Sequence, residues 1–97
     1  MAYSTSKAAV IHLSKCLART LAPEVQVNVI APGFIGETRS NVGRPNLEAT
    51  IQTAIQSATL KRAGRPEDIA SAALYLATRA DFMTGDVMVL DGGRALG

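Results

Sequence analysis

Tryptophan is absent from this 97-residue chain, and the other aromatic residues are two phenylalanines and two tyrosines. So few rings leave little surface for stacking nucleic-acid bases or for anchoring at a membrane interface. No apolar run approaches the roughly 18 residues of a membrane-spanning helix, and the first residues lack the basic-then-apolar pattern of a secretory signal. We therefore expect neither a membrane nor a nucleic acid as a partner.

Cysteine occurs once, at Cys16, so no disulfide can form within the chain. A single thiol is typical of proteins in a reducing compartment, and we expect a cytoplasmic location. Neither sign of charge is in large excess. The chain has 10 Lys and Arg residues and 8 Asp and Glu residues, for a formal net charge of +2. These charges are spread along the chain, so no phosphate-binding stripe is predicted.

What the chain does contain is hydrophobic residues, at 47%, arranged with helical and strand periods. Apolar residues three and four apart predict three amphipathic helices, over residues 3–21, 47–60 and 66–78. Pro23 ends the first helix, because proline disfavours helical geometry in the residue before it. Pro66 suits the first turn of the third helix, where Glu67 and Asp68 favour the positive helix end.

Two short runs rich in β-branched or apolar residues predict strands, at Val25 to Ala31 and at Asp86 to Asp91, the second one buried. Residues Phe34 to Pro45 are predicted to form a loop. The order helix, strand, helix, helix, strand indicates an α/β fold in which two parallel strands are joined by a right-handed helical crossover. Two strands leave both sheet edges open, so we expect them to belong to a larger sheet.

Tyr3 and Lys7 stand four residues apart at the start of the first helix. Positions four apart differ by about 40° around a helix and about 6 Å along it, so both side chains lean over one patch. A free phenol ionises only near pH ~10, but a cation about 4 Å away favours the phenolate by about 4 kcal/mol at an effective dielectric of ~20. The pair is therefore a candidate acid–base centre, although ring and alkyl packing on a solvated face is the common alternative.

Four blocks of sequence, in this order and spacing, resemble the short-chain dehydrogenase/reductase family, and in particular its ketoacyl-carrier-protein reductases and sugar or alcohol dehydrogenases. The blocks are Tyr3-Ser4-Thr5-Ser6-Lys7-Ala8-Ala9, residues 28–35 (Asn-Val-Ile-Ala-Pro-Gly-Phe-Ile), residues 62–70 (Arg-Ala-Gly-Arg-Pro-Glu-Asp-Ile-Ala), and Thr84-Gly85 followed by Asp91-Gly92-Gly93. In register, they extend over nearly the whole chain, from Tyr3 to Gly93. The resemblance implies the C-terminal part of a Rossmann-type, doubly wound parallel sheet.

The resemblance also implies roles for individual residues in hydride transfer between a carbonyl and an alcohol with NAD or NADP. Tyr3 would exchange a proton with the substrate oxygen, and Lys7 would favour its ionisation and bind the nicotinamide ribose. Pro32 and Gly33 would line the nicotinamide side of the pocket, and the backbone of Ile35 would meet the carboxamide. The threonine that family members commonly have five residues after this proline is shifted by one position here, to Thr38, because Glu37 takes its place.

Several family elements are absent from the chain: the glycine-rich turn that holds the pyrophosphate, the residue that selects NAD or NADP, and an Asn and a Ser that precede the tyrosine. We expect residues 1–97 to be the C-terminal portion of an NAD(P)-binding domain, arising from a truncated gene, a gene model begun at an internal Met, or a fragment. Without those elements, we expect little or no activity from the chain alone.

Other residues have plainer interpretations. His12 lies about 180° around the helix from Tyr3, which favours packing or a subunit contact. Cys16 is predicted to be a small buried hydrophobe. The cations Lys61, Arg62 and Arg65 are predicted to flank a solvated helix start, and Phe34, Leu47 and Ile51 to line a lid over a neutral carbonyl or alcohol substrate. Core or oligomer contacts are expected for Phe82, Met83 and Met88.

Two alternatives to an enzyme remain open. In the family, the first helix and the last strand with its preceding helix form subunit interfaces, so the complete enzyme is expected to be a homo-oligomer, a dimer or a tetramer. The present chain could then be a non-catalytic interaction module that associates with an intact relative. A further alternative takes Lys61 to Arg79 as a helix-turn-helix reader of DNA, which would bind duplex with a steep salt dependence.

Overall fold

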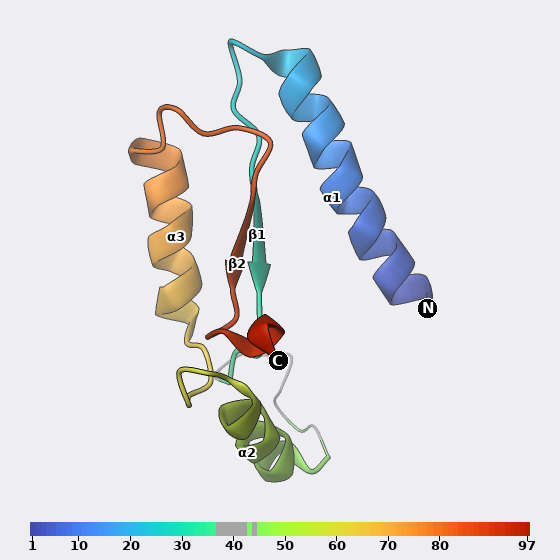
Figure 1. The fold of residues 1–97 in the computed structure, drawn as a ribbon, viewed down its shortest axis with the longest axis vertical. Helices are drawn as coiled ribbons and strands as arrows, with labels where there is room; N and C mark the ends of the chain where they lie inside the picture. The colour runs from blue at the N-terminus through green and yellow to red at the C-terminus, as the bar shows by residue number, and fades with distance from the viewer. Residues whose placement is uncertain (37–42, 44) are drawn as a thin grey trace.

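The computed structural model describes residues 1–36, 43 and 45–97. Its elements are α1 (Ala2–Leu21), β1 (Val29–Pro32), α2 (Leu47–Ser57), α3 (Pro66–Thr78), β2 (Val87–Leu90) and a short 3-10 helix, η2 (Arg94–Leu96). Figure 1 shows the two strands between α1 and α3, with α2 beyond the end towards which both strand arrows point. No helix of the described ranges is long and apolar enough to cross a membrane.

The two strands pair in parallel, with Val29 opposite Val87 and Pro32 opposite Leu90. Since α2 and α3 lie between them in sequence, the predicted α/β order with a helical crossover is confirmed. The first strand is shorter than predicted, because the predicted strand began at Val25 and β1 begins at Val29. The residues just before β1 are engaged elsewhere, in hydrogen bonds to the loop that precedes β2.

That loop is held at the amino end of the sheet by two side-chain amides. Gln26 Nε2 donates to the carbonyl oxygens of Ala80 and Met83, and Asn28 Nδ2 donates to the Met83 carbonyl at 3.0 Å. Asn28 Oδ1 also accepts from the backbone N–H of Asp86 at 3.1 Å. The polar side chains that alternate with valines at 25–29 therefore fix the loop between α3 and β2, although Gln26 remains exposed.

Helix α1 reaches the sheet near its own carboxyl end. Lys15 Nζ donates to the Gly85 carbonyl at 3.1 Å, and a Cβ placed on Gly85 would lie 3.6 Å from the Cβ of Ala18. Ala18 is accordingly 3% exposed, the one buried residue of this helix. Helix α1 ends before Pro23 as predicted, with Ala22 in an extended conformation.

The buried residues of the described chain are all alanines, namely Ala18, Ala54, Ala58 and Ala80. Large apolar side chains remain accessible, above all on α1, where Leu13 is 57% exposed. Two predictions of burial are wrong: Cys16 is exposed, and Val89 in the strand predicted to be buried is 55% exposed. The physical reason is that nothing within the described residues covers the far side of α1 or the outer face of β2. Phe82 is likewise fully exposed.

Helix α3 begins as its sequence predicts, with Pro66 in the first turn. Asp68 Oδ2 accepts from the backbone N–H of Arg65 at 2.8 Å, and the guanidinium of Arg62 binds both carboxylate oxygens, at 2.8 and 3.1 Å. The hydrogen bonds from Arg62 and from the Arg65 backbone hold the pKa of Asp68 well below its ordinary value. Residues 61–79 contain this one helix, so the helix-turn-helix alternative is wrong.

Candidate active site

Tyr3 and Lys7 occupy the first two turns of α1, on one face as the spacing predicted. Lys7 Nζ lies over the Tyr3 ring, 5.2 Å from the ring centroid, and the tyrosine side chain is 74% exposed. This is the geometry of a cation–π contact, worth about 0.5–1 kcal/mol at an exposed site. The helix thus presents a phenol and an ammonium together on an open surface.

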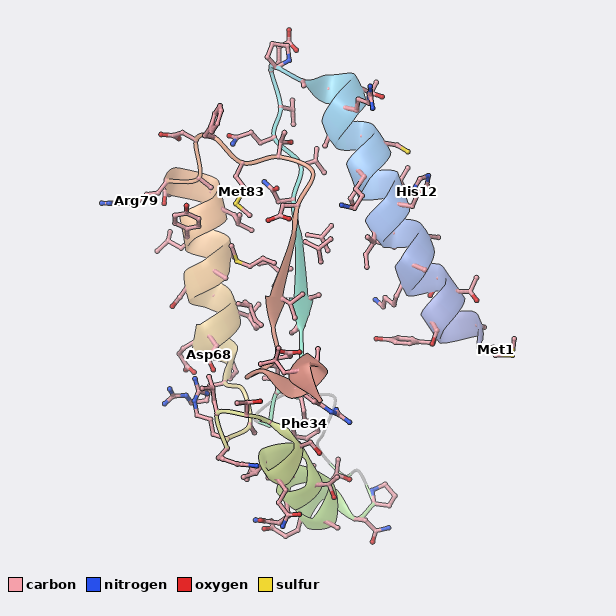
Figure 2. The ribbon with its side chains drawn as sticks, viewed as in Figure 1. Met1, His12, Phe34, Asp68, Arg79 and Met83 are labelled. Carbon is pink, nitrogen blue, oxygen red and sulfur yellow. The ribbon has the colours of Figure 1, made fainter. Side chains whose placement is uncertain are left out.

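The amino end of α1, which carries this pair, lies level with the carboxyl ends of the strands (Figure 1). Parallel α/β proteins bind ligands beyond the carboxyl ends of their strands. The pair and the residues that follow β1 therefore lie at the end where such a fold places its ligand site. His12, by contrast, extends from the side of α1 that faces away from the sheet (Figure 2).

Gly33 follows β1 directly and lies against the residue that follows β2. Its N–H donates to the Leu90 carbonyl at 2.9 Å, and a Cβ placed on it would lie 2.8 Å from the Cα of Asp91. Since real Cβ contacts are not that short, a larger residue here would push the two strand ends apart. The Pro32-Gly33 turn thus keeps the carboxyl edge of the sheet narrow and its backbone accessible.

The segment after this turn pairs with a residue that sequence reasoning did not include in the site, Gly64. The Gly64 N–H donates to the Phe34 carbonyl at 2.8 Å, and the Gly36 N–H donates to the Gly64 carbonyl at 3.0 Å. The isolated parallel bridge between Ile35 and Gly64 interrupts what was predicted to be a plain loop from Phe34 to Pro45. A Cβ on Gly64 would lie 2.5 Å from Cδ1 of Ile35, so a side chain does not fit at this position. The glycine in the Arg62–Ala70 block was therefore the one sequence signal of this contact.

Asp91 organises the turn after β2. Its carboxylate accepts from the N–H groups of Gly93 at 2.9 Å and Ala95 at 3.0 Å, at the start of η2. Thr59 Oγ1 donates to the Gly93 carbonyl at 2.9 Å, which joins this turn to the segment that follows α2. The Asp-Gly-Gly sequence thus forms a hydrogen-bonded turn, the Asp91 corner, that connects the end of the sheet to the segment after α2.

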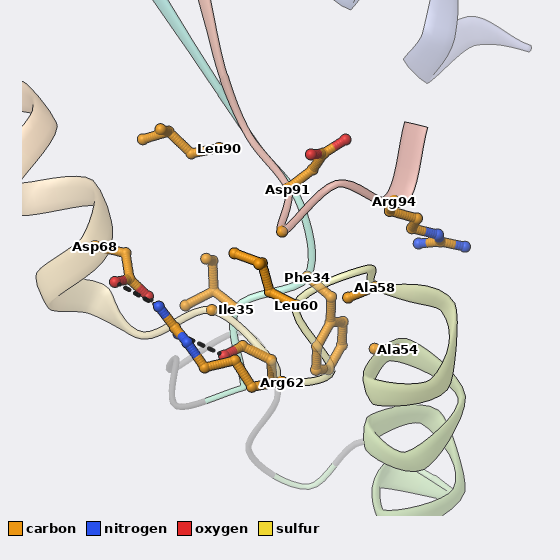
Figure 3. Close-up of a pocket in the computed structure, with 13 residues that line it drawn as sticks. Phe34, Ile35, Ala54, Ala58, Leu60, Arg62, Asp68, Leu90, Asp91 and Arg94 are labelled. Atoms are coloured by element: carbon orange, nitrogen blue, oxygen red, sulfur yellow. Dashed lines mark hydrogen bonds and ion pairs between the residues drawn. The ribbon is translucent and has the colours of Figure 1, made fainter. Parts of the chain in front are cut away.

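A cavity of about 220 Å³ lies between this corner, the Phe34 segment and α2 (Figure 3). Its apolar wall includes Phe34 and two of the buried alanines, Ala54 and Ala58. The paired charges of Arg62 and Asp68 lie at one side, where Figure 3 draws their hydrogen bonds as dashed lines. Phe34 lines the cavity as expected, whereas Leu47 and Ile51 are not among its lining residues.

The site residues predicted from the sequence fall into two groups in the structure, and one of them lies outside the described residues. Tyr3 and Lys7 share one face, and Pro32, Gly33 and Ile35 follow one another at the carboxyl end of β1. Thr38 and the neighbouring Glu37 lie outside the described residues. No group of three or more His, Cys, Asp or Glu side chains able to hold a metal ion occurs in the described ranges.

The fold and the site together define a protein of the doubly wound α/β class with a parallel sheet. The chain belongs to the short-chain dehydrogenase/reductase family: a family model described as enoyl-(acyl carrier protein) reductase matches residues 1–95. Curated relatives agree with this assignment. An uncharacterized oxidoreductase of Mycobacterium tuberculosis is 45% identical over 94 residues, which is 95% of this chain and 35% of the relative. A 3-oxoacyl-[acyl-carrier-protein] reductase of Chlamydia pneumoniae is 41% identical over 93 residues, 94% of this chain and 36% of that protein.

Solved structures of relatives share the fold. A putative short-chain dehydrogenase/reductase from Burkholderia xenovorans matches with a TM-score of 0.83 and 38% identity, over 99% of this chain and 35% of that one. A small-chain dehydrogenase in complex with NADPH matches with a TM-score of 0.84 and 36% identity, over 93% of this chain and 41% of that one. The chain spans about a third of the length of the curated relatives it matches.

Proposed function

We propose that this chain is the C-terminal portion of an NAD(P)-dependent short-chain dehydrogenase/reductase that interconverts a carbonyl compound and an alcohol. The observation that carries the proposal is the Tyr3 and Lys7 pair on one face of α1, level with the carboxyl ends of both parallel strands. Membership in the family supports it, and so does the similar small-chain dehydrogenase that was solved in complex with NADPH.

When bound, the nicotinamide supplies or accepts the hydride. During reduction, the Tyr3 hydroxyl gives its proton to the carbonyl oxygen, and during oxidation it takes the proton back. The ammonium of Lys7, carried on a flexible four-carbon stem, turns from the ring face to the phenol oxygen and the nicotinamide ribose. Its positive charge stabilises the phenolate that remains after proton transfer.

The residues after β1 would line the nicotinamide side of the pocket. Pro32 would contribute its ring and Gly33 its backbone, because the close approach of Gly33 to Asp91 leaves no room for a Cβ on residue 33. The Ile35 backbone would meet the carboxamide, held in place by its bridge to Gly64. Thr38 would be a further contact to the cofactor.

The chain alone is proposed to have little or no activity, because it contains neither the glycine-rich turn nor the Ser and Asn of the family. Backbone N–H groups at a glycine-rich helix start hold the pyrophosphate, and one positioned donor to a reacting oxygen is worth about 2.7–4 kcal/mol. A complete enzyme of this kind would work as a homo-oligomer in the cytoplasm on a small carbonyl or alcohol.

Fragment complementation tests this function. The chain is mixed or co-expressed with the N-terminal portion of a relative that ends just before its catalytic tyrosine, and carbonyl-dependent oxidation of NADH and NADPH is followed. We expect turnover from the mixture and none from either part. Tyr3→Phe should lower it at least about 100-fold, the usual scale of general acid–base catalysis. Tyr75→Phe is the matched control, since Tyr75 is an exposed tyrosine on α3.

Equal losses in the two tyrosine variants would contradict the proposed role of Tyr3. A complex that forms with the N-terminal portion but shows no turnover with any carbonyl would instead support the non-catalytic interaction module. That second candidate is favoured by the open apolar side chains of α1, of which Val10 and Leu13 are each more than half exposed.

A further inference from the structure

The outer side of β1 is a strand edge without a partner. β2 pairs with β1 along one side, and the sheet has no third strand in the part of the chain that the structure describes. Two backbone hydrogen bonds, both of 2.9 Å, show which groups face β2: Val29 N–H to the Asp86 carbonyl and Gly33 N–H to the Leu90 carbonyl. Since neighbouring residues of a strand direct their backbone groups to opposite sides, the N–H and C=O of Ile30 and the C=O of Pro32 face away from β2.

β1 has the character of an interior strand. Val29, Ile30 and Ala31 are apolar, and all three are half-buried, so the strand does not alternate between an apolar and a polar face. Parallel strands that lie inside a sheet have this composition. A backbone N–H or C=O at such a depth needs a hydrogen-bond partner, and Ile30 has none on its outer side among residues 1–36, 43 and 45–97. One neighbour of β1 is therefore missing.

The outer side of β2 differs, because it has features that protect a strand edge. Two aspartates flank the strand, Asp86 before it and Asp91 after it. The Asp91 carbonyl, which faces away from β1, accepts from the Arg94 N–H at 3.2 Å, so the turn into η2 occupies the carboxyl end of this edge. Charged residues and covering segments are common devices against further strand pairing. The edge left for a partner is thus that of β1.

The missing neighbour has a natural source, because the chain spans about a third of the length of its relatives. We propose that a strand from the N-terminal portion of the enzyme adds in parallel to the outer edge of β1 and binds both backbone groups of Ile30. The parallel direction follows the β1–β2 pairing, since doubly wound sheets are mostly parallel. This inference rests on the proposed function, which supplies the N-terminal portion.

Pro32 determines where this pairing ends. Proline has no N–H, so the added strand finds its last donor at Ile30, and the Pro32 carbonyl remains as an acceptor only. Because Pro32 is the last residue of β1, it limits the pairing without blocking the edge before it. The carbonyl of the added strand opposite Pro32 receives no donor from β1. The added strand therefore leaves the sheet beside the Pro32-Gly33 turn, which is proposed to line the nicotinamide side of the pocket.

Amide hydrogen exchange of the 97-residue chain, alone and with the N-terminal portion of a relative, tests the proposal. We expect exchange of the Ile30 N–H to slow at least about tenfold when the portion is added, because the amide gains a strand partner. The Val89 N–H, which faces the outer edge of β2, is the internal control and should not change. Slowing at Val89 without slowing at Ile30 would overturn the proposal. Slowing at Ile30 that grows with the concentration of the chain alone would also overturn it, since a second copy would then occupy the edge.

A matched pair of proline variants measures the same edge by affinity. Ile30→Pro and Val89→Pro each remove one N–H that faces away from the neighbouring strand, at the edge of β1 and of β2 respectively. We expect the N-terminal portion to bind Ile30→Pro at least about tenfold more weakly and Val89→Pro within about threefold of the original chain. Equal losses would contradict the proposal, and the exchange measurement decides it if a variant fails to fold.

These readouts are separate from turnover, so the two proposals fail in different ways. A complex with a protected Ile30 amide and no turnover would contradict the proposed function and support the strand addition. An active complex with an unprotected Ile30 amide would support the function and overturn the strand addition.

Discussion

The two ends of the short parallel sheet are built in different ways. At the amino end, side-chain amides and one lysine bind backbone carbonyls of the loop before β2. At the carboxyl end, glycines bring backbone segments into close contact, and a cavity opens between the segments. Hydrogen bonds from long side chains stabilise the amino end. At the carboxyl end, glycines let backbone segments pack directly against one another, and the lack of side chains there leaves space beside the strand ends for a ligand.

Gly33→Ala should show the largest effect on stability, because it adds a Cβ where the carboxyl end has no room. That atom would lie 2.8 Å from the Cα of Asp91, so a backbone shift is required. We expect a loss of about 1–3 kcal/mol in the free energy of unfolding, measured by urea titration. Gly36→Ala is the control, since a Cβ there makes an ordinary 3.5 Å contact with Ala63. Similar losses in both variants would show that close approach is not what the glycine at 33 provides.

Asn28→Ala tests the amino end. The variant leaves the Asp86 N–H without its side-chain partner and removes one of the two donors to the Met83 carbonyl. An unpaired polar group costs about 1–3 kcal/mol when it is buried, and this site is partly buried, so we expect about 1–2 kcal/mol. Gln52→Ala, at an exposed position of α2, should change stability by less than about 0.5 kcal/mol. Faster hydrogen exchange confined to residues 83–86 in Asn28→Ala would locate the effect.

Asp68→Asn should produce a smaller, pH-dependent loss, at the helix start beside the cavity. Because Arg62 and the Arg65 backbone lower the pKa of Asp68 in the folded chain, the unfolded chain takes up this proton more readily. The stabilisation is therefore present above the ordinary aspartate pKa of about 4 and is lost as the pH falls through the lowered value. The thermal midpoints of the original chain and the variant should differ at pH 7 and converge in acid. A difference that stays constant with pH would contradict the ion-pair explanation, and Asp81→Asn is the control.

Lys15→Ala should have the smallest effect, although it removes the one side-chain hydrogen bond that joins α1 to the amino end of the sheet among the described residues. An exposed lysine contributes little, so we expect less than about 1 kcal/mol in the free energy of unfolding. Arg19→Ala, another exposed cation of α1, is the comparison. A loss larger than that of Asn28→Ala would mean that the lysine, rather than the amides, holds this end together.

Local features of the chain were predicted well. The helix from Pro66 to Thr78 and the start of α2 at Leu47 were given by apolar periodicity, and the end of α1 before Pro23 followed from the geometry of proline. The shared face of Tyr3 and Lys7 followed from their spacing alone. Each of these depends on residues within a few positions of one another, which the sequence displays directly.

Features that join distant parts of the chain were missed or misjudged. The bridge from Ile35 to Gly64 and the hydrogen bonds from Asn28 to Met83 and Asp86 link residues roughly 30 and 55 positions apart, respectively. The late start of β1 follows from the second set, since the polar residues before it bind the loop instead of a strand.

The sequence by itself therefore determined the helices, the parallel α/β order and the family, because these follow from local periodicity and from motifs in register. Tertiary structure alone decided that Cys16 is exposed beside His12, that Gly64 fastens the segment after β1, and that a cavity forms next to Asp91. The physical reason is that exposure, close backbone approach and cavity shape depend on which distant segments come together, and no single stretch of sequence records that.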